Sequence, residues 1–82
     1  MNKGTAFKAM GEYAKSIQAY DEAIRVDPHH AVVYNNKGNA LKAAGEIGRA
    51  IEAYEHAIQL NPHYAEAYNN RGNALKSPRT PL

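Results

Sequence analysis

The sequence predicts an all-α fold, an α-solenoid of antiparallel helix hairpins with about five helices. Two observations support this prediction. The first is an internal repeat, because 24 of the 41 residues from Asn2 to Lys42 are identical to the residue 34 positions further on. A fixed period in this range is typical of stacked helical repeats. The second is that apolar residues recur at helical spacing within each copy, with glycine and proline at the boundaries.

The repeat divides the chain into one complete unit and two incomplete ones. Residues 1–30 form a partial repeat, residues 31–64 the complete repeat, and residues 65–76 the first helix of a third. Residues 1–76 are therefore predicted to be one domain, and the proline-containing segment 77–82 is predicted to be a disordered tail. In a solenoid each repeat needs a neighbour to cover its apolar face.

Glycine and proline set the expected helix boundaries. Gly11 and Gly45 are expected to end the first helix of their copies, since glycine tolerates the left-handed conformation at a helix C-terminus. Pro28 and Pro62 follow the second helix, because the residue before proline disfavours helix. We name the first helix of each copy type A and the second type B. The expected helices are 2–10, 12–26, 31–44, 46–60 and 65–76.

Glycine also recurs inside the type A helices, where it costs about 1 kcal/mol relative to alanine. Gly4, Gly38 and Gly72 occupy one repeat position. We attribute this glycine to a close approach of helices A and B, with Ala50 as a second small residue at the same contact.

These residues resemble the tetratricopeptide repeat (TPR) family, whose pattern combines aromatic residues, glycine, alanine and proline at fixed spacing. Lys37 stands where the family has leucine. The resemblance implies a TPR superhelix and a module that binds a protein or peptide partner on the concave face, which the A helices line. In the central unit the pattern is carried by Tyr34, Gly38, Leu41, Ala50, Tyr54, Ala57 and Pro62.

The family's groove positions hold columns of asparagine and lysine in this sequence. Asparagine offers both a donor and an acceptor, so a column of them can pair with the backbone of an extended peptide. The column resembles the peptide-binding asparagine ladder of O-GlcNAc transferases, and the lysines add a mild preference for acidic ligands. The candidate groove residues are Asn2, Lys8, Asn35, Asn36, Asn39, Lys42, Asn69, Asn70, Asn73 and Lys76.

Other chemistries have weaker support. The chain has no cysteine, and His29, His30 and His63 lack further ligands at metal spacing, so a metal site is not expected. No catalytic set is recognisable, so we expect neither an enzyme nor a cofactor. Single-stranded nucleic acid is disfavoured as a partner, because the net charge is only +2 and no aromatic platform accompanies the lysines. No apolar run could span a membrane, and a cytoplasmic location is expected.

A second interpretation is a structural or self-assembly element. The incomplete first and third copies would expose apolar faces. Two chains could cover these faces by stacking end to end or by exchanging helices, which would produce a homodimer or a larger homo-oligomer.

Overall fold

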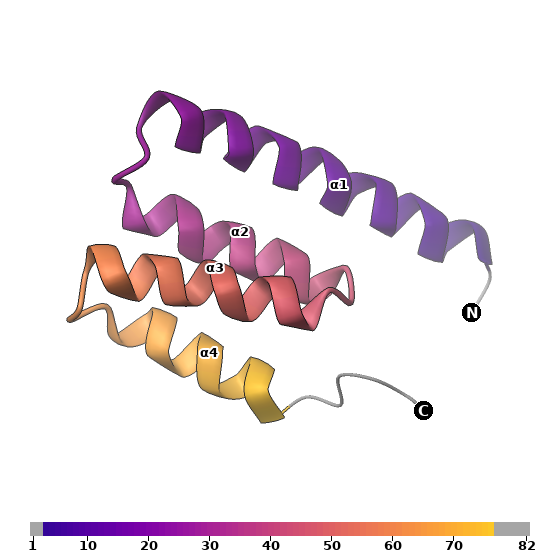
Figure 1. The fold of residues 1–82 in the computed structure, drawn as a ribbon. Helices are drawn as coiled ribbons and strands as arrows, with labels where there is room; N and C mark the ends of the chain where they lie inside the picture. Colours follow the sequence, from indigo (N-terminus) through magenta and orange to yellow (C-terminus); the bar gives the residue numbers. More distant parts are fainter. Residues whose placement is uncertain (1–2, 77–82) are drawn as a thin grey trace.

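The computed structural model describes the backbone of residues 3–76 and the side chains of residues 11–76. This part of the chain is all helical, which confirms the predicted fold class. Each helix runs antiparallel to the one before it, and the four lie in sequence order as a stack (Figure 1). They are α1 (Lys3–Val26), α2 (Ala31–Ala43), α3 (Ile47–Leu60) and α4 (Ala65–Lys76).

The prediction that Gly11 ends a helix is wrong. Residues 3–26 form one continuous helix, so the described chain has four helices and not five. Gly11 is exposed and does not have a positive φ. Continuing the helix through Gly11 keeps the backbone hydrogen bonds, and glycine in a helix costs only about 1 kcal/mol relative to alanine.

Gly45 ends its helix as predicted. Its φ is +88°, in the left-handed region that favours glycine. Its N–H donates to the Lys42 carbonyl at 3.0 Å, and the Glu46 N–H donates to the Leu41 carbonyl at 2.8 Å. This pair of bonds is the Schellman motif, which satisfies the last carbonyl groups of α2. The chain therefore reverses sharply, and α3 lies antiparallel to α2.

The two proline turns also have the predicted positions. The N–H of His29 donates to Oδ1 of Asp27 at 3.1 Å, and the N–H of His63 donates to Oδ1 of Asn61 at 3.2 Å. Asp and Asn favour turns because their side chains can bond the backbone two residues ahead. Both connections from a B helix to the next A helix therefore use the same local chemistry.

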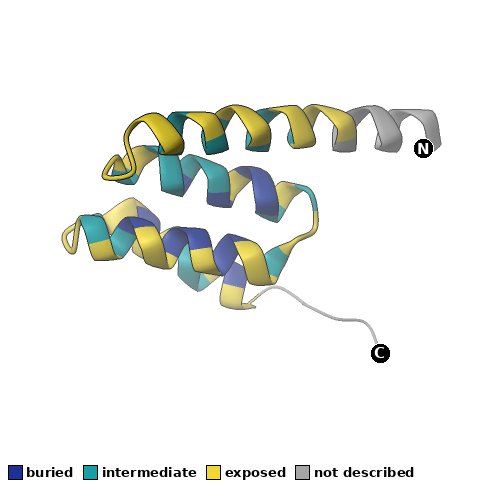
Figure 2. Cartoon of the chain, turned by 45° about the horizontal axis from the view of Figure 1, so that its top comes forward, coloured by how far each residue is buried: buried dark blue, intermediate teal, exposed yellow. Residues whose placement is uncertain are grey.

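The core lies where α2, α3 and α4 meet (Figure 2). Tyr54 on α3 is 0% exposed and is the largest fully buried side chain among the described residues. Its ring covers Gly38 so closely that a Cβ on that glycine would lie 2.5 Å from Cε1 of the ring. Ala50 and Leu41 are buried beside it. The predicted close approach at Gly38 is thus confirmed.

Gly72, the equivalent glycine on α4, is in a different environment. A Cβ at Gly72 would have no heavy atom within 4 Å. Its neighbours Tyr68 and Leu75 are 43% and 49% exposed, whereas Leu41, the equivalent of Leu75, is 1% exposed. This part of α4 is a copy of the α2 surface without a B helix packed on it.

Candidate protein-interaction surface

A pair of asparagines joins the two described A helices. Nδ2 of Asn70 on α4 donates to Oδ1 of Asn35 on α2 at 3.1 Å. Asn35 is only 1% exposed and Asn70 is half-buried, so this bond lies at the edge of the stack with its acceptor on the buried side. A buried amide that lacked such a partner would cost free energy. Asn35 therefore holds α2 and α4 together and also orients the side chain of Asn70.

A second asparagine is oriented by the core. The hydroxyl of Tyr54 donates to Oδ1 of Asn39 at 2.6 Å. Burial of this tyrosine raises its pKa, so the hydroxyl stays protonated and remains a donor at neutral pH. The bond uses the oxygen of the exposed Asn39 amide and not its Nδ2 group, which is a donor.

The other predicted groove residues differ in exposure. Asn36, Lys42 and Asn70 are half-buried. Asn2 and the side chain of Lys8 lie outside the described residues. The exposed members of the predicted set are Asn39, Asn69, Asn73 and Lys76. Helical periodicity places Asn36 and Asn39 on the same side of α2, next to the asparagine bridge to α4.

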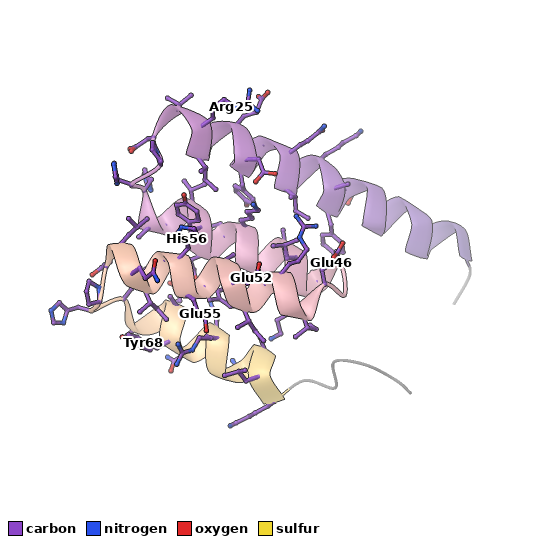
Figure 3. The ribbon with its side chains drawn as sticks, in the orientation of Figure 1. Arg25, Glu46, Glu52, Glu55, His56 and Tyr68 are labelled. Atoms are coloured by element: carbon purple, nitrogen blue, oxygen red, sulfur yellow. The ribbon has the colours of Figure 1, made fainter. Side chains whose placement is uncertain are left out.

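Two of the basic residues on the A helices form ion pairs with B helices. Nζ of Lys37 lies 2.6 Å from a carboxylate oxygen of Asp21 on α1. At the equivalent position one repeat later, the Arg71 guanidinium lies 4.0 Å from the Glu55 carboxylate on α3. Figure 3 shows Glu55 on the side of α3 that faces α4. These contacts repeat between helices, so both residues belong to the stacking of the solenoid.

A small hollow lies on the opposite side of α2 from Asn36 and Asn39. It has a volume of about 150 Å³. Inside it the rings of Tyr34 and His56 stack with centroids 4.6 Å apart and planes inclined by 20°. This pair is not predictable from the sequence, because the two residues are 22 positions apart and no motif links them. The lining residues are Tyr34, Lys37, Leu41, Arg49, Glu52, Ala53 and His56.

The described residues contain neither a metal-binding cluster nor a helix that could span a membrane. Among residues 11–76, whose side chains are placed, no group of three or more histidine and acidic residues could hold a metal ion. His29, His30, His56 and His63 are all exposed. None of the four described helices is long and apolar enough to cross a membrane.

The fold and the sequence identify the family. A family model described as TPR repeat matches residues 4–45 and again residues 38–77, which together cover most of the chain. The chain therefore belongs to the TPR family. TPR repeats are non-enzymatic modules that mediate protein–protein interactions. No curated protein sequence has a significant match to this chain.

Proposed function

We propose that the chain binds an extended segment of a protein partner across α2 and α4. The observation that supports this is the fixed orientation of two amides. Asn39 accepts from Tyr54 and so presents its Nδ2 as a donor, while Asn70 donates to Asn35 and so presents its Oδ1 as an acceptor. An extended backbone offers carbonyl and N–H groups in alternation, which matches a donor on one helix and an acceptor on the next.

Preorganisation makes this surface suited to binding. A side chain that is already held in one rotamer loses less conformational entropy when a ligand binds. Lys42 and Lys76 occupy one repeat position beside the amides and favour a segment that carries acidic side chains, with an attraction that salt weakens. Asn35 is buried and is therefore left out of the proposed contact surface.

The test is a binding measurement with two asparagines removed. The double variant Asn39→Ala/Asn70→Ala is expected to weaken binding about tenfold or more, because each lost hydrogen bond is worth about 0.5–1.5 kcal/mol. The probe is the best-binding sequence from an array of acidic and neutral dodecapeptides, with its affinity measured by fluorescence anisotropy. Gln59→Ala on α3 is the control, since Gln59 is exposed and lies outside the proposed surface.

Circular dichroism of the double variant must show the helicity of the wild type. If the affinity of the selected peptide is the same in the double variant and in Gln59→Ala, the proposed surface is wrong.

A second candidate function, self-assembly, is favoured by the exposed Tyr68 and Leu75 on α4.

A further inference from the structure

On a B helix of this fold, two consecutive residues lie on two different faces and contact two different A helices. On α3, Tyr54 packs on Gly38 of the preceding helix α2, and the next residue, Glu55, pairs with Arg71 of the following helix α4. Successive residues in a helix point about 100° apart. A tyrosine followed by an acid therefore lets one helix contact the A helix before it and the A helix after it.

The helix α1 carries the same pattern, a tyrosine followed by an acid, and among the described residues only the acid pairs with a following A helix. Asp21, the equivalent of Glu55, pairs with Lys37 of the following helix α2. Tyr20, the equivalent of Tyr54, is directed about 100° away from that contact. The glycine that it would cover, Gly4, lies within α1 itself, and Tyr20 is only half-buried.

The helix α4 has the opposite arrangement, a glycine position with no tyrosine packed on it among the described residues. Residues 68–76 are identical to residues 34–42 of α2 at eight of nine positions. Yet Gly72 has open space where Gly38 has a tyrosine ring, and Leu75 is 49% exposed. Within the described residues, Gly72 on α4 thus has no tyrosine packed on it, and Tyr20 on α1 has its equivalent glycine, Gly4, in its own helix.

We propose that α1 of a second copy of this chain packs on α4, with Tyr20 of that copy covering Gly72. The contact inside each chain between α2 and α3 supplies the geometry. Residues 16–24 of α1 share five of nine residues with residues 50–58 of α3, including the tyrosine. The joined α4 and α1 make a complete TPR hairpin, and the second copy continues the stack. Because the two surfaces differ, the interface is heterologous and stays open at both ends.

Two single substitutions each disable one of the two surfaces of this interface, Gly72→Ala the surface on α4 and Tyr20→Ala the surface on α1. Gly72→Ala leaves the isolated chain unstrained, because nothing lies within 4 Å of the added Cβ, but it puts that atom where the incoming tyrosine ring must sit. Tyr20→Ala removes the ring and leaves Gly72 open. Overpacking at a contact this close is expected to raise the dissociation constant about tenfold or more. Gly48→Ala is the matched control, since Gly48 is also helical with open space around it.

The experiment is sedimentation velocity of the full chain from micromolar to millimolar concentration. The wild type and Gly48→Ala are expected to form dimers and then longer species as concentration rises. Each blocked variant alone is expected to remain a monomer, and a 1:1 mixture of Gly72→Ala with Tyr20→Ala is expected to form a heterodimer that grows no further. The mixture works because each variant supplies the surface that the other lacks.

Several results would overturn the pairing: a wild type that is monomeric throughout, a Gly72→Ala variant that assembles like the wild type, or a mixture that stays monomeric. Circular dichroism checks that each variant is folded. If Tyr20→Ala loses helicity, Ala23→Gln replaces it, because Ala23 is the equivalent of the fully buried Ala57 and glutamine is a good helix former. The assay contains no peptide, so its outcome is independent of the proposed groove.

Discussion

Replacing Tyr54 with alanine is expected to remove a large part of the stability of the protein. The side chain is fully buried, packs on Gly38 and bonds Asn39. Removing a buried aromatic ring costs about 3–5 kcal/mol, because the cavity closes only in part. A chain of this length has a total stability on the order of 4–12 kcal/mol. Urea unfolding followed by circular dichroism should show a midpoint shifted far towards zero denaturant.

The control for this variant is Tyr68→Ala, measured at a concentration at which the wild type is monomeric. Tyr68 is 43% exposed, and its described ring contact is with the Arg71 guanidinium, 5.7 Å from the ring centroid. Its loss is expected to cost less than about 1 kcal/mol. Equal effects of the two substitutions would mean that burial of Tyr54 does not organise the core.

The same substitution is expected to have opposite effects at two equivalent glycines. Alanine stabilises a helix by about 1 kcal/mol relative to glycine. At Gly72 this gain is unopposed, so Gly72→Ala should raise the free energy of unfolding of the monomer. At Gly38 the added Cβ would meet Cε1 and Cδ1 of the Tyr54 ring at 2.5 and 2.7 Å. Overpacking of this kind costs about 1–3 kcal/mol, so Gly38→Ala should destabilise the protein by about 2 kcal/mol at the most.

Urea unfolding of both variants, again below the concentration of any assembly, checks this pair of signs. Two stabilised variants would show that helices α2 and α3 can separate at no cost. Two destabilised variants would show that a neighbour also covers Gly72 in the monomer.

The repeat period made the fold class predictable, but the helix count depended on tertiary contacts. Lys8–Glu12 and Lys42–Glu46 differ at one residue of five, yet the first segment continues a helix and the second forms a turn around Gly45. Local propensity is nearly equal in the two segments. The turn at Gly45 forms because α2 can bury Leu41 against α3, and such packing decides between local alternatives.

The candidate surface was predictable in position but not in detail. The spacing of the asparagines placed Asn36 and Asn39 on one side of α2, and both keep some exposure. It also placed Asn35 in the groove, where the structure buries it in a bond to Asn70. The angle between neighbouring A helices decides which of these asparagines remain exposed to water. A repeat pattern does not contain that angle, and it also does not reveal contacts such as that between Tyr34 and His56.

A tyrosine on a B helix that covers a glycine on the preceding A helix holds the two helices of a repeat together. A double-mutant cycle of Gly38→Ala and Tyr54→Leu measures this contact most directly. The smaller leucine relieves the clash with alanine, so the two changes should couple by about 1 kcal/mol or more. The same cycle with Gly72→Ala should show no coupling in the monomer. Additive effects at Gly38, or equal coupling at both glycines, would contradict the claim.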